Sequence, residues 1–185
     1  QRIRPGLDDK VLASWNGLMV TTFAYAAFVL GSEEYLQVAL RAGDFLSCSM
    51  IDQGRVFRTW RDGKASLNGY LDDYAALAEA FLWLFEVSGD QRWLIQAREL
   101  VESSLELFWD EEEGDFFFTS KDHENLIVRH KEHMDNATPS GNAMSCLNLL
   151  RLSRLLGEQE YWDRGCAMLE RKSVAMSRHP LAFSY

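Results

Sequence analysis

Two consecutive carboxylates, Asp72 and Asp73, stand between Tyr70 and Tyr74 at the start of a long apolar stretch. Carboxylates can act as general acid, base or nucleophile on a sugar, and tyrosine rings can pack on its apolar faces. Consecutive helical residues point about 100° apart, so these two acids do not suit the pair that glycoside hydrolysis needs. A pair from different segments, Asp73 with Asp9, is the better catalytic hypothesis. The alternative is that the acids only cap a helix.

Two further polar blocks precede apolar stretches in the same way, one at residues 7–19 and one at residues 135–142. If all three blocks open neighbouring helices, their side chains converge at one end of a bundle. Aromatic rings, carboxylates and amides together suit a carbohydrate-like ligand, whereas capping alone would use the same residue types. The predicted substrate-binding residues are Asp8, Trp15, Asn16, Trp60, Tyr70, Asp72, Tyr74, Asp135, Asn136, Ser140 and Asn142.

Histidines offer a different chemistry, since a sugar epimerase uses a base to move a proton beside a carbonyl group. His130 and His133 come just before the third polar block and could reach the same end of the bundle. Their His-x-x-His spacing has no third ligand beside it, so it does not indicate a metal site. We expect no metal and no cofactor.

These residues must be positioned by helices, and the apolar pattern of the sequence predicts six helices. Three are apolar almost all round, at about residues 12–30, 69–87 and 139–157, and are expected to be buried. Each is followed by an amphipathic helix, at about 33–50, 91–109 and 158–176. Gly31, Gly89 and Gly157 separate the members of each pair and recur about every 60 residues, a period too long for tetratricopeptide or ankyrin repeats.

This alternation predicts an all-α fold, an incomplete (α/α)6 toroid with buried inner helices and amphipathic outer ones. The expected units are residues 7–66, 67–133 and 134–185, with short β-hairpin loops near Val56–Trp60 and within residues 114–128. Three hairpins do not close a ring, and repeat units need neighbours or caps. We therefore expect the remainder of a toroid, or a second copy, as a partner.

The composition of the chain argues against two classes of partner, nucleic acids and membranes. The formal net charge is −9 and the isoelectric point about 4.9. Lys and Arg are scattered without a basic stripe, which argues against a nucleic-acid partner. Three isolated cysteines fit a reduced, cytoplasmic protein. Residues 11–32 carry no charge, but a buried helix explains this segment better than a membrane span does, so no membrane partner is expected.

Three motifs resemble those of a known family. They are LDDKVLASWNGLM at residues 7–19, GYLDDYA at 69–75 and DNATPSGN at 135–142. In this order they are similar to the thioredoxin-domain-containing proteins related to spermatogenesis-associated protein 20. The first and third motifs are long and specific, whereas the second recurs in other α/α toroids.

The resemblance implies an N-terminal thioredoxin-like domain, absent from this chain, followed by an (α/α)6 toroid. That toroid is similar to N-acylglucosamine 2-epimerases and six-hairpin glycosidases. The resulting hypothesis is a toroid that binds or processes a carbohydrate-like small molecule within a larger protein. Two alternatives stay open, namely a non-catalytic scaffold for the redox domain and an N-acyl-sugar 2-epimerase or isomerase.

Overall fold

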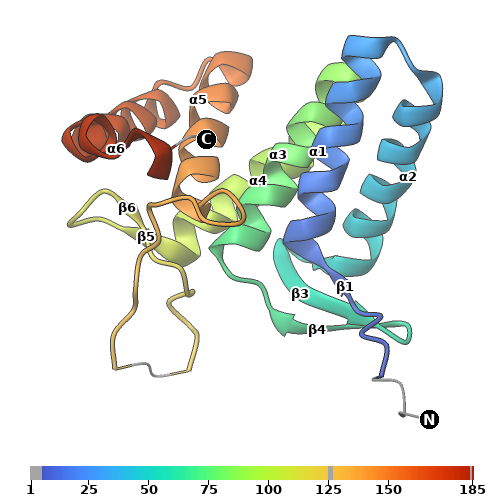
Figure 1. Cartoon of the computed structure of the whole chain (residues 1–185), viewed down its shortest axis with the longest axis horizontal. Coiled ribbons are helices and arrows are strands. Elements are labelled where there is room, and N and C mark those ends of the chain that lie inside the picture. The colour runs from blue at the N-terminus through green and yellow to red at the C-terminus, as the bar shows by residue number, and fades with distance from the viewer. Residues whose placement is uncertain (1–5, 125–126, 184) are drawn as a thin grey trace.

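A computed structural model describes residues 6–124, 127–183 and 185. The described residues form three helical hairpins that stand next to one another (Figure 1). The first comprises α1 (Ala13–Leu30) and α2 (Glu33–Met50), the second α3 (Leu71–Ser88) and α4 (Gln91–Phe108), and the third α5 (Gly141–Leu156) and α6 (Gln159–Arg178). A short 3-10 helix, η1 (Pro180–Ala182), follows α6. The predicted all-α partial toroid is confirmed.

Helix α3 lies at the centre, because it packs against α1, α4 and α5. Every residue from 73 to 82 is buried, which explains why this helix is apolar on all sides. The outer helices α2, α4 and α6 are amphipathic, as their sequence pattern predicts. Each inner helix ends at a glycine in the left-handed conformation, Gly31, Gly89 or Gly157, which this residue adopts without steric cost.

Short strands lie below the starts of α1 and α3 (Figure 1). Strand β3 (Arg55–Arg61) pairs antiparallel with β1 (Val11–Leu12), β2 (Ile51–Asp52) and β4 (Lys64–Asn68). The predicted hairpin arm near Val56 is therefore confirmed.

The second hairpin differs from the prediction, because the partner of the strand near residue 115 precedes it in the chain instead of following it. It pairs β5 (Trp109–Asp110) with β6 (Asp115–Phe116). The strand expected at residues 126–128 is wrong for Ile127 and Val128, which are exposed and outside any strand, and residue 126 lies outside the described residues.

Helices α1 and α3 meet backbone to backbone at Gly17. A Cβ atom there would lie 2.9 Å from the carbonyl carbon and oxygen of Ala76. We therefore expect Gly17→Ala to lower the free energy of unfolding by about 1–3 kcal/mol, because overpacking outweighs the better helix propensity of alanine. Urea unfolding would measure this loss. Gly6→Ala, where nothing lies within 4 Å, is the matched control; an unchanged midpoint for Gly17→Ala would contradict the close approach.

By length and composition alone, α1 could cross a membrane, and among the described residues it is the one helix that meets this criterion. In the structure it packs against α2 and α3, so one side of α1 is part of the core. Its remaining side exposes large apolar residues, among them Trp15, Met19 and Phe28.

Candidate functional site

The starts of α1, α3 and α5, with the loops around them, form what we call the inner mouth. Ser14 at the start of α1 donates its backbone N–H to Asp73 Oδ1 over 3.1 Å, which ties the first two helix starts together. The start of α5 packs closely on the start of α3 at Gly141, where a Cβ atom would lie 2.9 Å from the Leu71 side chain. The three polar blocks therefore belong to one end of the fold, as predicted.

Asp73 is the structural centre of this end. Its side chain has no exposed surface, and its carboxylate accepts hydrogen bonds from the N–H of Ser14, the N–H of Tyr70 at 3.0 Å and Arg58 Nη1 at 2.8 Å. These contacts join α1, α3 and β3. A carboxylate with this burial has no surface left for a ligand, so the catalytic role predicted for Asp73 does not fit its position.

Asp72 is the carboxylate that reaches the surface, with 22% of its side chain exposed. Arg58 Nη1 contacts both of its oxygens, but at 3.3 and 3.5 Å, because its shortest bond goes to Asp73. Two carboxylates thus share one guanidinium group. Burial, followed by the negative charge of Asp73, raises the pKa of Asp72 to about 6, against the opposing effect of Arg58.

Aromatic and imidazole rings surround these charges. Tyr70 stacks on Phe118 with ring centroids 4.9 Å apart, and the Arg58 guanidinium lies 4.8 Å from the centroid of the Tyr70 ring. His130 packs on Phe118 at 5.0 Å, and the His123 ring lies 5.7 Å from that of Tyr70. Asp72 therefore sits beside a cluster that contains an arginine, two aromatic rings and two histidines.

A hollow of about 240 Å³ opens beside the start of α1. It is lined by Asp8, Lys10, Leu12, Trp15 and Asn16. Trp15 is 62% exposed and offers an uncovered indole face. Lys10 Nζ donates to Asp8 at 2.6 Å, and Asn16 donates to the carbonyl oxygen of Leu12 at 2.8 Å, so the polar lining is ordered by local hydrogen bonds.

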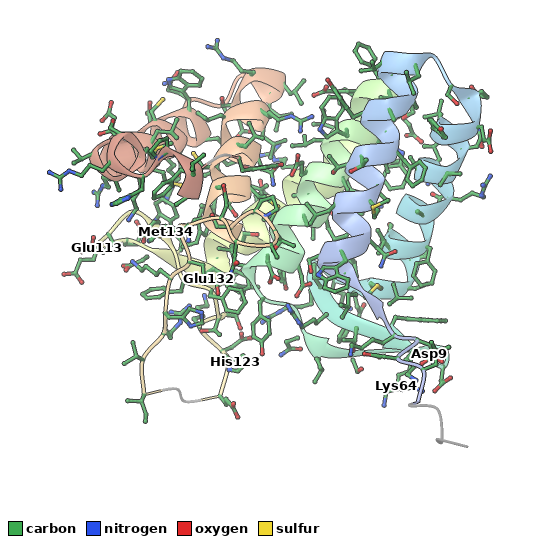
Figure 2. All side chains as sticks on the ribbon, in the orientation of Figure 1. Asp9, Lys64, Glu113, His123, Glu132 and Met134 are labelled. Carbon is green, nitrogen blue, oxygen red and sulfur yellow. The ribbon has the colours of Figure 1, made fainter. Side chains whose placement is uncertain are left out.

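Asp9, the other predicted catalytic acid, lies elsewhere. It forms an ion pair with Arg61 at 2.9 Å, and both side chains are about half exposed. Figure 2 places Asp9 at the outer edge of the sheet near Lys64, whereas His123 lies on the long loop. Because Asp73 is buried and Asp9 is held by the sheet, these two acids do not form an accessible pair.

Two predicted binding residues use their rings for packing between elements. Tyr74 is 1% exposed; its hydroxyl accepts from the N–H of Val56 at 3.1 Å, and its ring meets Phe108 edge to face. Trp60 on β3 packs edge to face on Phe45 of α2, with centroids 5.2 Å apart. The binding role predicted for Tyr74 does not fit its burial, whereas Trp60 is only partly buried and its role in binding stays a prediction.

The third block is used mainly for capping. Ser140 and Asn142 are each 3% exposed. Ser140 Oγ accepts from the N–H of Ala143, and Asn142 makes three hydrogen bonds to the backbone of Phe116 and Glu132. Their predicted contact with a substrate does not fit this burial.

Asp135 and Asn136 line a separate hollow of about 180 Å³. Asp135 accepts from the backbone N–H of Ser140 at 2.9 Å and from that of Tyr185 at 3.0 Å. These two residues remain at the surface of the mouth, and their role in binding stays a prediction.

We call Asp72 and the arginine, aromatic and histidine side chains around it the Asp72 cluster. Three of its members are not among the predicted catalytic acids, substrate-binding residues or histidine bases. Arg58 lies on β3, in a stretch with a second arginine that the sequence explains equally well as an exposed hairpin tip. Phe118 and His123 lie outside the helices and strands, on an irregular loop. Nothing in their local pattern signals that the loop folds back onto Tyr70. His133, one of the two predicted bases, points away from this cluster and contacts Asp115 and Lys172 instead.

No protein-family model matches the chain. The chain is 35% identical to human spermatogenesis-associated protein 20 over 98% of its own length, but this covers only 24% of the human protein. The chain is similar to one segment of spermatogenesis-associated protein 20. The resemblance that the three motifs predict is confirmed, and the chain spans about a quarter of the length of the relatives it matches, including the rat protein.

Solved structures share the fold of this chain. An inactive variant of an α-1,6-mannanase from Salegentibacter, with α-1,6-mannotriose bound, superimposes with a TM-score of 0.71 at 14% identity, over 87% of this chain and 46% of the mannanase. The cellobiose 2-epimerase of Bacillus thermoamylovorans gives 0.72 at 18% identity, over 87% of this chain and 44% of the epimerase. Such identities establish the fold alone.

Proposed function

We propose that the inner mouth binds a carbohydrate, with Trp15 as a stacking surface and Asp72 as the proton donor to a glycosidic oxygen; the bond from this oxygen to the anomeric carbon breaks while a water molecule attacks that carbon and loses its proton to solvent. The observation that carries this proposal is the position of Asp72, a partly exposed carboxyl group with a pKa raised to about 6 at the start of the central helix. A general acid works best when its pKa is near the operating pH. A carboxyl group that is protonated at mildly acidic pH meets this need.

The geometry supports a single extended site. Ser14 and Asp73 are hydrogen-bonded to each other, and Trp15 and Asp72 are their immediate neighbours in the chain. This bond brings the starts of α1 and α3 together, and the proposed site extends from the hollow at Trp15 to Asp72 across this junction. The mannanase gives independent support, because its inactive variant is substituted at two consecutive aspartates, and Asp72 and Asp73 are also consecutive.

Asp73 and Arg58 would act through Asp72. The guanidinium gives its shortest contact to Asp73 and leaves Asp72 with longer ones, so Asp72 is the acid that retains a proton. The backbone N–H groups of Ser14 and Tyr70 hold Asp73 in place. Asp73 and Arg58 are therefore positioning residues and do not touch the sugar.

Replacing Trp15 tests sugar binding without touching the charges. We expect Trp15→Ala to weaken the binding of α-1,6-mannotriose by about 5-fold or more, because an aromatic platform contributes about 1 kcal/mol or more. Isothermal titration of the chain with mannotriose and with cellobiose would measure this. Phe28→Ala is the matched control, since Phe28 is 70% exposed near the other end of the same helix.

The outcomes of this titration separate the candidate functions. Binding of neither sugar to the parent chain would favour the non-catalytic scaffold. Binding of cellobiose with exchange of a sugar C2 proton for deuterium would favour the epimerase, for which His123 and His130 beside the Tyr70–Phe118 stack are the observation in its favour. Loss of binding in Phe28→Ala as well as Trp15→Ala would contradict a site at the inner mouth.

We also propose that the exposed apolar side of α1 packs against further helices of a ring. The solved toroids are about twice as long as the matched part, and the curated relatives about four times as long, which supports this occupant over a second copy. Sedimentation velocity of the chain alone would show a monomer; a stable dimer would favour the second copy. The thioredoxin-like context stays a prediction from the family resemblance, and the cytoplasmic location stays a prediction from the three isolated cysteines.

A further inference from the structure

A second cavity lies between α5, α6 and the segment that follows α6, and the start of α5 contributes Asn142 and Ala143 to its lining. Its volume is about 230 Å³. Its walls are mainly apolar, formed by Leu147, Leu150, Met168, Leu169, Met176 and Phe183. Methionine side chains adapt their shape to a ligand more readily than branched ones do. The cavity is smaller than the roughly 300–1,000 Å³ of pockets for drug-sized molecules, so it fits a smaller ligand.

One end of this cavity is strongly polar. Asp115, His133 and Lys172 line it. Lys172 Nζ lies 3.3 Å from Asp115 Oδ2 and 3.2 Å from His133 Nε2, and His133 Nε2 lies 3.2 Å from the same Asp115 oxygen. The other oxygen, Asp115 Oδ1, accepts from Lys131 Nζ at 2.5 Å. We call these four residues the Asp115 cluster; Figure 2 marks Glu132 and Met134, the chain neighbours of His133, below α6.

Asp115, His133 and Lys172 all line the cavity, and Lys172 is the most exposed of the three. The Asp115 side chain is 4% exposed, whereas those of His133 and Lys172 are 23% and 31% exposed. Lys131 is held by short contacts to Asp110 and Asp115. Lys172 has only longer contacts, so its ammonium group keeps a donor for a ligand. Lys172 is therefore the cation at this end of the cavity that is most available to a ligand.

Other chemistries fit the cavity less well. Burial is the main cause that raises the pKa of the Cys146 thiol to about 11, so this cysteine is not a nucleophile. Lys131 and Lys172 each contact one oxygen of Asp115, so this carboxylate is already paired with ammonium groups and does not suit a metal cation. Burial and the charge of Lys172 lower the pKa of His133 below its usual value, so His133 is a neutral hydrogen-bonding group near neutral pH.

We propose that this cavity binds a small amphipathic anion, a medium-chain carboxylate whose apolar tail lies between α5 and α6 and whose head group meets Lys172. The apolar walls supply the affinity for the tail, at about 0.8 kcal/mol for each buried CH₂ group. The exposed ammonium of Lys172 selects the anionic head group. This site does not depend on the carbohydrate site, because none of its residues belongs to the Asp72 cluster or to the hollow at Trp15.

Octanoate is the probe that tests this proposal on the 185-residue chain. We expect a Kd on the order of 0.1–1 mM, with shifts of the methyl signals of Met168 and Met176 in NMR spectra of methyl-labelled protein. Butanoate should bind at least 10-fold more weakly, because it has four fewer CH₂ groups. Octylamine should not bind, because its ammonium head group has the same positive charge as Lys172 and is repelled by it.

Substitutions at Lys172 locate the head group. Lys172→Met should weaken octanoate at least 10-fold, and Lys172→Arg should largely restore binding. Lys64→Met is the matched control, since Lys64 is an exposed lysine on β4 outside this cavity. Equal affinity for octanoate and octylamine, unchanged binding in Lys172→Met, or methyl signals that do not shift would each overturn the proposal. The last result would fit a cavity that is filled by side chains of neighbouring helices.

Discussion

Asp73→Ala is expected to lower the free energy of unfolding by about 3–5 kcal/mol, the range found when one partner of a buried ion pair is removed. The carboxylate is fully buried and accepts from Ser14, Tyr70 and Arg58. The substitution leaves two backbone N–H groups without an acceptor and leaves Arg58 with only its longer contacts to Asp72. Because these donors come from three elements, the junction of α1, α3 and β3 loses its common acceptor.

Urea unfolding at neutral pH would measure this effect. Asp73→Asn is the informative second variant, because it keeps one acceptor oxygen but removes the charge that Arg58 contacts, so its loss should be smaller. Asp44→Ala is the matched control: Asp44 is a half-exposed acid on α2 paired with Arg92 at 2.8 Å, and exposed pairs contribute about 0–1 kcal/mol. Equal losses for Asp73→Ala and Asp44→Ala would show that Asp73 is not the acceptor that joins the three elements.

The helical architecture was predictable because burial leaves a simple mark on the sequence. A helix with neighbours on all sides must be apolar all round, and α3 is the clearest case. Its end was also predictable, because Gly89 adopts the left-handed conformation with φ of 70°. The position of the polar blocks followed from the same pattern, since each one opens an inner helix.

The roles of individual polar residues were less predictable, because capping and ligand binding use the same side chains. Ser140, Asn142 and Asp73 carry the residue types of a sugar site, yet they are occupied by backbone N–H and C=O groups. Tyr74 lies one turn after Tyr70 and looks equivalent in the sequence. The direction of its side chain toward Val56 and Phe108 depends on tertiary packing, which no local pattern encodes.

The difference between Asp72 and Asp73 also required the three-dimensional structure. In the sequence the two acids are adjacent and alike. In the fold one of them faces the N–H groups of two helix starts, and the other faces Arg58 at longer distances and partly faces solvent. Their different environments convert two similar residues into a positioning group and a candidate acid.

Asp72→Asn is expected to reduce the hydrolysis of an α-1,6-mannoside by about 10²–10⁴-fold, the usual contribution of a general acid. The parent chain should show an alkaline limb in kcat/KM near pH 6, because Asp72 must be protonated to donate and its pKa is raised to about 6. The variant should lack this limb, since asparagine does not titrate. An aryl mannoside with a good leaving group should be affected less, because its departure needs little protonation.

The same substitution has an effect on stability that requires no substrate. The pKa of Asp72 is raised in the fold from 3.8 to about 6, so the folded state binds more protons than the unfolded state between these values. The stability that Asp72 contributes is fully present below about pH 4 and is lost as the pH rises through 6. Asp72→Asn should therefore gain stability relative to the parent as the pH rises from 4 to 7, by on the order of 2 kcal/mol.

Melting temperatures of both proteins across pH 4–7 would measure this change, and Asp44→Asn, on an exposed pair of α2, should follow the parent. The two readouts test different steps of the argument. A difference in melting temperature that does not vary with pH would contradict the raised pKa and with it the choice of Asp72 as the acid. A pH-dependent difference in stability together with mannoside hydrolysis that is unchanged in Asp72→Asn would retain the pKa but remove Asp72 from the chemistry. Only a response in both measurements supports a proton that Asp72 holds in the fold and delivers to a substrate.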